Sequence, residues 1–393
     1  RVLVAAFTNQ AVDNVLLRLR EEGVDDFVRL GHELSVAPSL RGQRLAERAR
    51  MALLEQQEMK RDGLMADLEA ATAAPLDPAN LRASLLRAPL VATTTATWSA
   101  ERFDETGDVL RFDLAIVDEA SQLTVPALLG ALRFARRFVL VGDDRQLPPL
   151  VVSAQAAERG LKRSLFAELL ARWGDDASVA LRRQYRMHPA ICDFPSRAFY
   201  NGGLVTAGSA RTALLDIALD AREPLGMVLA PERPVVFVDV PSQREASGKT
   251  SVAQAEVVRR LVLALRRGGV AAAEIGAIAP YRAQVAAIRQ RLAAQGEAEV
   301  AVDTVDRFQG GERQVIIYSF GGRVEGGRAI HRTQDADFLA DSHRLNVALT
   351  RAQRKLILVG DRHWLRTKPL IAQLIDYCAQ LYGGRGGVIS ARW

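Results

Sequence analysis

Two apolar runs that end in polar and charged residues constrain the fold of this chain more than any other feature. They are residues 114–119, LAIVDE, and residues 138–143, FVLVGD. Apolar runs of this length are typical of strands that are buried on both faces of a parallel sheet. Because such sheets bind ligands at the carboxyl ends of their strands, we expect the polar residues that follow to line a site.

The residue types at these two strand ends suggest phosphate chemistry. Asp118 is positioned to hold a Mg²⁺ ion, directly or through water, and Glu119 to orient a water molecule for attack on a phosphate. Gln146, after the second run, could sense the terminal phosphate. This pattern is typical of one half of a motor ATPase, with ATP and Mg²⁺ as its cofactors.

Strand-like and helix-like segments alternate along the whole sequence. This alternation predicts an α/β fold made of two parallel-sheet domains. We assign residues 1–152 to the first domain and residues 153–393 to the second. The first domain carries a helical insertion at about residues 32–88, in which residues 40–71 have the pattern of a helical stalk or hairpin.

The composition is that of a globular protein, with 49% apolar and 25% charged residues. No apolar run approaches the ~20 residues that cross a bilayer, and no signal peptide is present, so we expect a cytoplasmic protein without a membrane partner. Cys192 and Cys378 lie far apart, which argues against a disulfide framework or a cysteine-rich metal site. The net charge of +6 permits binding to a polyanion without proving it.

A phosphate-binding loop of the form G-x-x-x-x-G-K-[ST] does not occur in the sequence. Residues 248–250, Gly-Lys-Thr, match its end, but Gln243 occupies the position of its first glycine. The residues between them are not glycine-rich, so we interpret Lys249 as an ordinary loop lysine. We therefore expect the sequence to begin just after such a loop.

Polar residues at three other positions have two interpretations each. Thr8 and Asn9 follow the first strand-like run, and Thr94 and Thr95 end a later one. They could cap the helices that follow or contact the backbone of a nucleic-acid strand. Arg282, after Pro-Tyr, is either a backbone contact or the solvated start of a helix.

Five motifs occur in order along the chain: residues 117–122 (VDEASQ), 142–149 (GDDRQLPP), 184–189 (QYRMHP), 304–310 (TVDRFQG) and 346–352 (NVALTRA). This ordered series resembles superfamily 1 helicases, and the resemblance covers nearly the whole chain. The most similar branch holds the eukaryotic replication helicase–nuclease and the nonsense-mediated-decay RNA helicase, and residues 111–150 look more like the replication enzyme.

The resemblance implies two RecA-like domains with ATP between them and a single strand across the top. It implies that Asp118 binds Mg²⁺, Glu119 activates water and Gln146 couples the phosphate to the nucleic-acid site. Arg186 and Arg351 would act as arginine fingers from the second domain. The other implied contacts are Tyr185 near the adenine, Gln309 and Gly310 near the phosphates, Glu312 on the ribose and Thr304 on the nucleic acid.

Two residues near these motifs carry different expectations. We expect His188 to be a structural hydrogen-bonding residue rather than a base. Lys249 and Glu256 lie in a segment similar to a family motif near the nucleic acid, but Gln254 stands where asparagine is usual. We assign no role to that segment.

These observations predict an ATP-dependent helicase or translocase that moves 5′-to-3′ on single-stranded DNA. An RNA helicase of the same branch is an alternative, because the contacts that discriminate RNA from DNA cannot be read from one sequence. Two other functions stay open, a nucleic-acid-binding remnant without turnover and an NTPase that acts on proteins. Without the phosphate-binding loop, these residues alone should bind ATP poorly, and two distant cysteines cannot ligate the iron–sulfur cluster of the replication nuclease.

Overall fold

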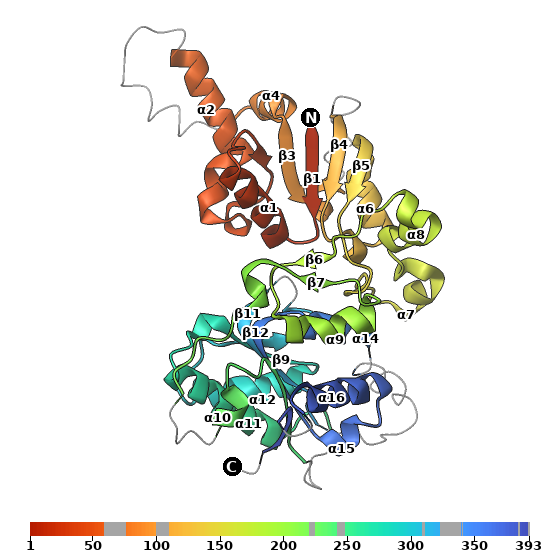
Figure 1. Cartoon of the computed structure of the whole chain (residues 1–393). Helices are drawn as coiled ribbons and strands as arrows, with labels where there is room; N and C mark the ends of the chain where they lie inside the picture. Colours follow the sequence, from red (N-terminus) through yellow and green to blue (C-terminus); the bar gives the residue numbers. More distant parts are fainter. Residues whose placement is uncertain are drawn as a thin grey trace. The chain divides into compact units, whose positions relative to one another are not determined.

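The computed structural model describes residues 1–58, 76–99, 110–219, 225–241, 248–308, 311–322, 339, 341–383 and 386–391. The chain forms two compact units (Figure 1). Unit 1 comprises residues 1–144 and 148–178, and unit 2 comprises residues 145–147 and 179–393. The division falls later than the expected residue 152, because Leu165 and Phe166 pack on the hydrophobic core of unit 1.

Unit 1 is built on a five-stranded parallel sheet with the strand order β2-β3-β1-β4-β5. Alternate residues of the central strand point to opposite faces, so that Leu3 and Ala5 join one core cluster while Val4 and Ala6 join the other. The strands are β1 (Val2–Ala6), β2 (Val28–Arg29), β3 (Leu90–Thr94), β4 (Phe112–Val117) and β5 (Ala135–Leu140).

Helices cover both faces of this sheet. Val12 and Leu16 of α1 pack on one face, and Trp98 packs on the other, edge-on to Phe112 with ring centroids 5.7 Å apart. The expected stalk begins as a helix only at Leu45, after a 3₁₀ turn, and residues 59–75 lie outside the described part. The helices and helical turns are α1 (Asn9–Glu21), η1 (Glu33–Ser35), η2 (Pro38–Gln43), α2 (Leu45–Glu58), α4 (Pro78–Arg87), α5 (Thr95–Trp98), η6 (Ala120–Gln122), α6 (Val125–Leu132), α7 (Ala154–Ala156), η7 (Ala157–Leu161), α8 (Leu165–Trp173) and η8 (Gly174–Asp176).

Strand β5 departs from the expectation that both apolar runs are buried on both faces. It is the edge strand of the sheet, and no described strand pairs with its other side. Phe138 and Val139 are 49% and 48% exposed. The prediction of a strand was correct, but the prediction of burial was wrong for β5, since the described residues leave this edge uncovered.

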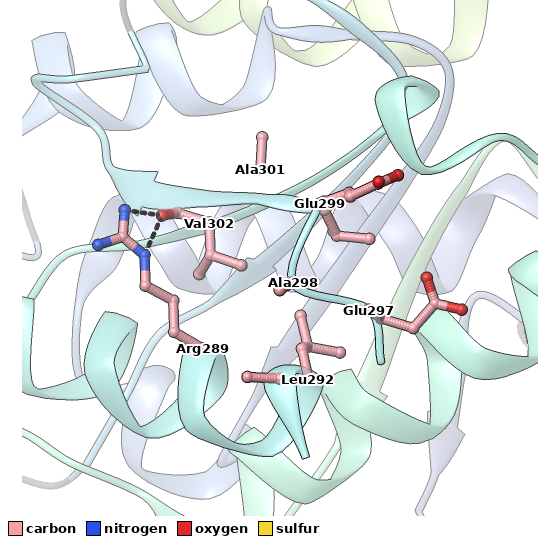
Figure 2. Close-up of a pocket in the computed structure, with 9 residues that line it drawn as sticks. Arg289, Leu292, Glu297, Ala298, Glu299, Ala301 and Val302 are labelled. Atoms are coloured by element: carbon pink, nitrogen blue, oxygen red, sulfur yellow. Dashed lines mark hydrogen bonds between the residues drawn. The ribbon is translucent and has the colours of Figure 1, made fainter. Parts of the chain in front are cut away.

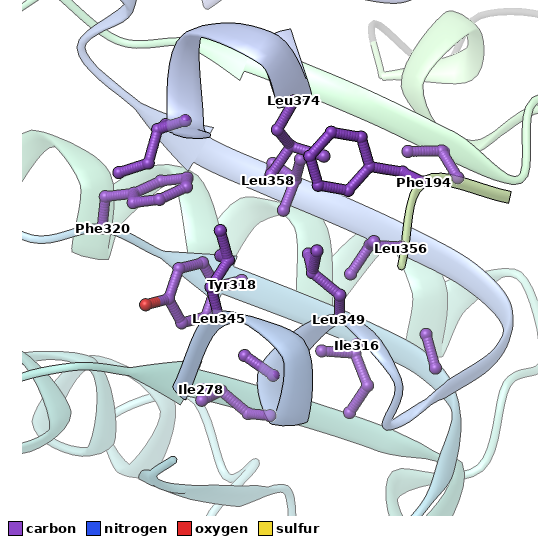
Figure 3. Close-up of a cluster of buried hydrophobic side chains, with 14 of the residues drawn as sticks. Phe194, Ile278, Ile316, Tyr318, Phe320, Leu345, Leu349, Leu356, Leu358 and Leu374 are labelled. Carbon is purple, nitrogen blue, oxygen red and sulfur yellow. The ribbon is translucent and has the colours of Figure 1, made fainter. Parts of the chain in front are cut away.

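Unit 2 contains a six-stranded parallel sheet with the strand order β10-β9-β11-β12-β8-β13. Alternation again splits the core in two, with Val235 and Phe237 in one cluster and Val236 and Val238 in the other. Figure 3 shows the first cluster, where strand residues such as Ile316 meet helix residues. The strands are β8 (Val235–Asp239), β9 (Ile275–Ala279), β10 (Ala301–Thr304), β11 (Arg313–Ser319), β12 (Ala352–Gly360) and β13 (Val388–Ser390).

Helices α11 and α12 cover one face of this sheet, and α9, α14 and α16 cover the other (Figure 1). A short parallel pair, β6 (Arg183–Gln184) with β7 (Val205–Thr206), lies outside the main sheet. The helices and turns are α9 (Pro189–Phe199), η9 (Gly208–Arg211), α10 (Gly226–Leu229), α11 (Val252–Arg267), η10 (Ala272–Glu274), α12 (Arg282–Ala293), α14 (Ser342–Leu349), α15 (Arg362–Leu365) and α16 (Pro369–Leu381).

Two parallel sheets with helices on their faces confirm the predicted α/β fold. Among the helices of the described residues, none has the length and apolar character needed to cross a membrane.

Lys355 is an ionisable residue buried inside strand β12 of unit 2. Its ammonium group donates hydrogen bonds to the backbone oxygens of Ala230, at 2.9 Å, and Arg233, at 2.5 Å. Burial lowers the pKa of Lys355 from its ordinary value of 10.5 to about 7. Between these pH values the unfolded chain binds more protons than the folded chain, so this residue makes stability rise with pH.

We expect the free energy of unfolding to increase as the pH is raised from 7 to 9, and Lys355→Met to lose much of this increase. Urea denaturation at a series of pH values measures the effect. Arg354→Met, at the neighbouring and partly exposed position, is the matched control and should keep the wild-type pH dependence. An unchanged slope in Lys355→Met would assign the pH dependence to another group.

Candidate functional site

The acidic pair of unit 1 lies at the carboxyl end of β4. The backbone N–H of Asp118 still donates to the oxygen of Ala5, at 2.8 Å, which continues the strand pairing. Glu119 then adopts a φ of +54°, a left-handed conformation that is rare for a residue with a side chain. Its N–H donates to Asp118 Oδ1 at 2.9 Å, and the amide of Gln122 donates to its carboxylate. Glu119 is therefore oriented through both its backbone and its side chain.

The chain after β5 packs closely against this acidic turn. A Cβ on Gly142 would lie 3.0 Å from the backbone nitrogen of Ser121, so that a larger residue would push the two segments apart. The Ser121 hydroxyl accepts the N–H of Asp143 at 3.3 Å, and the oxygen of Val141 accepts the N–H of Ala120 at 2.9 Å. The two strand ends that the sequence singled out are thus neighbours at one edge of the sheet.

The carboxylate of Asp118 fits a magnesium ion by its donor chemistry. It is partly exposed at the sheet edge, and Mg²⁺ prefers carboxylate oxygens and water as ligands. Asp118 would hold the ion there, and the carboxylate of Glu119 is adjacent to it in the chain.

A turn in unit 2 presents the first predicted arginine finger. The side-chain oxygen of Gln184 accepts the N–H groups of Arg186, at 2.9 Å, and Met187, at 2.7 Å, and its amide donates to the oxygen of Met187 at 2.9 Å. Gln184 therefore closes the turn that carries Arg186. The sequence analysis placed Gln184 within a motif but assigned it no role. Its position two residues before Arg186 was a signal that could have indicated this turn-closing role.

The predicted finger and the predicted ribose ligand are in direct contact within unit 2. The guanidinium of Arg186 forms an ion pair with the carboxylate of Glu312 and donates to the oxygen of Thr350 at 3.3 Å. The other carboxylate oxygen of Glu312 accepts the amide of Gln353 at 2.9 Å. Both charged side chains are partly exposed, so a ligand could reach them.

The second predicted finger, Arg351, is almost fully buried, with 3% of its surface exposed. Its Nε donates to the oxygen of Val347 at 3.1 Å, and its Nη2 donates to the side-chain oxygen of Gln146 at 3.0 Å. Because Thr350 contacts Arg186, the two predicted fingers meet at one turn. The structure thus brings Arg186, Arg351, Gln146 and Glu312 together.

Gln146 reaches this cluster because residues 145–147 pack with unit 2. The side-chain amide of Asn346 donates to the oxygen of Arg145 at 2.9 Å, and Leu147 is buried in the core of unit 2. The sequence had predicted Gln146 at a strand end of the first domain. Local pattern could not reveal this, because the hydrogen-bond partners of Arg145 and Gln146 lie 201 and 205 residues away along the chain.

Of the three remaining predicted nucleotide contacts, the structure describes one, and it also describes the neighbouring His188. Tyr185 is 67% exposed and its ring lies beside Gly208, where a Cβ would approach it to 3.0 Å. His188 caps α9, its Nδ1 accepting a backbone N–H at 3.1 Å, and burial lowers the pKa of His188, as suits a structural residue. The other two, Gln309 and Gly310, lie outside the described residues.

The predicted nucleic-acid contacts of unit 1 fall into two groups. Thr8 is exposed at the carboxyl end of β1 and caps α1. Phe7 beside it is 47% exposed, an aromatic that the sequence analysis did not single out. Thr94 and Thr95 are buried, and the hydroxyl of Thr94 accepts the N–H of Thr97 at 3.4 Å. This is the helix-capping role that the sequence left as the alternative.

A buried ion pair supports the loop that carries Thr8 and Asn9. Arg29 has no exposed surface, and its Nε donates to Asp13 at 2.7 Å. Its Nη2 donates to the side-chain oxygen of Asn9 at 2.9 Å, while the second carboxylate oxygen of Asp13 accepts the N–H of Ala37 at 2.8 Å. The sequence analysis did not predict this ion pair. An arginine within the apolar run FVRL was the signal that it missed.

Breaking this ion pair should destabilise unit 1 strongly. We expect Asp13→Asn or Arg29→Met to lower the free energy of unfolding by about 3–5 kcal/mol, because each leaves a buried group without its partner. Urea denaturation measures this. The double variant Asp13→Asn with Arg29→Met should lose less than the two single losses together. Arg18→Met, at an exposed pair on the same helix, is the control that should stay near wild type.

The predicted nucleic-acid contacts of unit 2 lie at the carboxyl ends of two neighbouring β-strands. Arg282 is exposed at the first turn of α12, directly after β9. Thr304 ends β10 and is partly exposed, with its N–H bonded to Asp303 Oδ1 at 2.8 Å. Since β9 and β10 are paired, the two residues lie at the same edge of the sheet.

A pocket of about 400 Å³ lies elsewhere in unit 2, between the end of α12 and the start of β10 (Figure 2). Leu292 and Val300 line it, and Arg289 beside it donates two hydrogen bonds to the oxygen of Val302. None of the predicted site residues lines this pocket, and we assign it no role.

Comparison with known proteins identifies the family. Two family models, each described as an AAA domain, match residues 161–363 and 39–154. DNA replication ATP-dependent helicase/nuclease DNA2 of Mus musculus is 36% identical over 397 residues, which covers 96% of this chain and 34% of that protein. The 5'-3' DNA helicase ZGRF1 of Mus musculus is 32% identical over 392 residues, covering 96% of this chain and 20% of that protein.

A solved complex of Arterivirus nonstructural protein 10 (helicase) with DNA matches at 14% identity and a TM-score of 0.41, covering 91% of this chain and 53% of that chain. The chain spans about a third of the length of the first curated relative and a fifth of the second. The first family model covers more than half of the chain. The chain therefore belongs to this AAA domain family, and its ordered motifs make it a superfamily 1 helicase region similar to that of the DNA replication helicase/nucleases.

Proposed function

We propose that this chain is the motor core of an ATP-dependent helicase that moves 5′-to-3′ on single-stranded DNA. The observation that carries the proposal is the cluster of Arg186, Arg351, Gln146 and Glu312 in unit 2, because phosphoryl transfer depends mainly on positioned charge. The motif series supports the polarity, as does the printed name of the relative ZGRF1. We propose DNA rather than RNA because of the same motif series and the printed name of the relative DNA2.

Unit 1 supplies the carboxylates in this proposal. Bound Mg-ATP provides the phosphate anhydride and a metal charge that offsets the negative charge of the phosphates. Asp118 holds the metal and Glu119 orients the attacking water. The left-handed backbone of Glu119 and the contacts to its carboxylate support this role, since backbone strain is often found at functional sites.

Unit 2 supplies cations that neutralise the phosphates. Arg186 leaves its ion pair with Glu312 to reach a phosphate, and Glu312 then becomes available to the ribose. Arg351 acts through the same turn. Gln146 couples the phosphate to the nucleic-acid site, and its contact with Arg351 holds it within unit 2. Hydrolysis at the nucleotide phosphates thereby affects the residues that contact the nucleic acid.

In this proposal a strand that carries a phosphate-binding loop pairs with the edge of β5 that no described strand covers. Two observations support it. An exposed apolar edge strand such as β5, with Phe138 and Val139 half exposed, is normally paired or covered in a stable protein. A strand added there would also bring its carboxyl end to the edge that carries Asp118 and Glu119.

In this proposal each unit contacts the nucleic acid at the carboxyl edge of its own sheet. Phe7 offers a stacking surface, Thr8 and Asn9 offer polar groups for the backbone, and Arg282 and Thr304 do the same in unit 2. The buried residues Thr94 and Thr95 are not part of this proposed surface.

Substitution of the proposed catalytic residues tests the motor. In a form of the protein that includes a phosphate-binding loop, Glu119→Gln should lower the rate of ATP hydrolysis by at least about a hundredfold. Arg186→Ala should lower it by about a thousandfold or more, because a finger arginine stabilises the transition state. Glu158→Gln and Arg197→Ala, exposed positions outside the site, are the controls and should keep the wild-type rate. Equal rates in Glu119→Gln and wild type would contradict the assignment.

The same assay with and without polynucleotide tests the substrate. We expect single-stranded DNA to stimulate hydrolysis, and the stimulation to weaken steeply as salt is raised, since phosphate contacts release counterions. Turnover that ignores both DNA and RNA would instead favour an NTPase that acts on proteins. Binding of single-stranded DNA without any ATP hydrolysis would favour the nucleic-acid-binding remnant.

A further inference from the structure

A buried hydroxyl group lies beside the turn of unit 2 that carries Arg186. It belongs to Thr206, the last residue of β7, which is 9% exposed. β7 pairs in parallel with β6, and the register of this pair places Thr206 opposite Gln184. Thr206 therefore stands next to the residue that closes the Arg186 turn (residues 184–187), although it lies outside the five sequence motifs.

The hydroxyl of Thr206 completes the hydrogen bonding of Gln184. It accepts a hydrogen bond from the side-chain amide of Gln184 at 2.5 Å and donates one to the backbone oxygen of Met187 at 3.3 Å. The same amide nitrogen donates to the Met187 oxygen at 2.9 Å. The two N–H groups of the Gln184 amide thus have one partner each, which fixes the direction in which this side chain points.

The direction of the Gln184 side chain decides the shape of the Arg186 turn. While its amide nitrogen is held by Thr206, its oxygen accepts the backbone N–H groups of Arg186, at 2.9 Å, and Met187, at 2.7 Å. A side chain turned end for end would place its own N–H groups against these two donors. Thr206 therefore selects the orientation in which Gln184 closes the turn.

Strand β7 is itself held on helix α9, so Thr206 has a defined position. The hydroxyl of Ser196 on α9 donates to the backbone oxygen of Leu204 and accepts its N–H, both at 3.1 Å. Gly202, between α9 and β7, has a φ of +75°, a conformation that lets the chain reverse there. Because α9 packs in the core of unit 2, the support runs from this core through β7 to the turn.

The side chain of Arg186 has contacts of its own, but they are at its guanidinium group and not at its backbone. The guanidinium forms an ion pair with Glu312 and donates to the oxygen of Thr350 at 3.3 Å. In the proposed function it leaves Glu312 to reach a phosphate. A long side chain that exchanges partners reaches the second one in the same geometry each time only if its backbone stays in place.

We propose that Thr206 is a positioning residue for the predicted arginine finger and that it acts on Arg186 through Gln184. This inference rests on the proposed function, because it requires Arg186 to stabilise charge at a phosphate. A group with that role must be held in place by residues that are themselves fixed. Valine at position 206 would keep the shape of threonine but leave an N–H of Gln184 without its partner.

Hydrogen exchange of the backbone N–H groups of Arg186 and Met187 tests the positioning on the whole chain without any nucleotide. Thr206→Val should raise their exchange rates by about tenfold, because the loss of a buried partner frees Gln184. Thr206→Ser keeps the hydroxyl and should keep the wild-type rates. Val205→Ala, at the neighbouring exposed position of β7, is the matched control and should also keep them. Wild-type exchange rates in Thr206→Val would overturn the proposal.

The kinetics of ATP hydrolysis test whether this position matters for the reaction. In a form of the protein that includes a phosphate-binding loop, Thr206→Val should lower kcat by about ten- to a hundredfold and leave the KM for ATP unchanged. Thr206→Ser should restore kcat, and Val205→Ala should keep it. In the Arg186→Ala background, Thr206→Val should have almost no further effect, because both changes act through one side chain.

The failure of this inference and the failure of the proposed function give different results. An equal loss of kcat from Thr206→Val in the wild-type and Arg186→Ala backgrounds would assign the loss to the fold of unit 2 and overturn the positioning role. A wild-type rate of hydrolysis in Arg186→Ala, or no hydrolysis in the wild type, would overturn the proposed function and this inference with it.

Discussion

The buried guanidinium of Arg351 is the interaction on which the arrangement of the unit 2 cluster depends. A buried cation is costly unless it is hydrogen-bonded, and here the partners are the Val347 oxygen near the end of α14 and the side chain of Gln146. The first partner fixes Arg351 against its own helix. The second holds residues 145–147 on unit 2. The same turn offers the Thr350 oxygen to Arg186, so one buried charge organises the cluster.

Two other buried polar networks hold loops at the carboxyl edges of the sheets. In unit 1 the pair of Asp13 and Arg29 supports Asn9. In unit 2 the buried side chains of Gln254 and Gln284 join the starts of α11 and α12 to the end of β11. Polar groups in these positions add little net stability when satisfied, but they cost several kcal/mol when one partner is lost. Networks of this kind specify one loop geometry, which the proposed nucleic-acid surface requires.

Much of the site could be predicted from local sequence, because strand ends and motif spacing are local properties. The residues Asp118 and Glu119 follow an apolar run, and that run is a strand of a parallel sheet. The position of Arg186 beside Glu312 could not be predicted from the motifs, since the two residues lie 126 positions apart and meet only through folding. The partial exposure of β5 was missed for the same reason, because an apolar run does not reveal whether its strand lies at an edge.

The sequence by itself determined the α/β class, the strands that end in candidate site residues and the resemblance to superfamily 1 helicases. These follow from periodicity and spacing, which short segments carry without reference to the rest of the chain. Only the tertiary structure decided that residues 145–147 pack with unit 2, that Asp13 is half of a buried ion pair and that Thr206 contacts the residue that closes the Arg186 turn. Such pairings depend on which distant segments bury one another, because a polar group taken out of water must find its partner wherever the fold brings one.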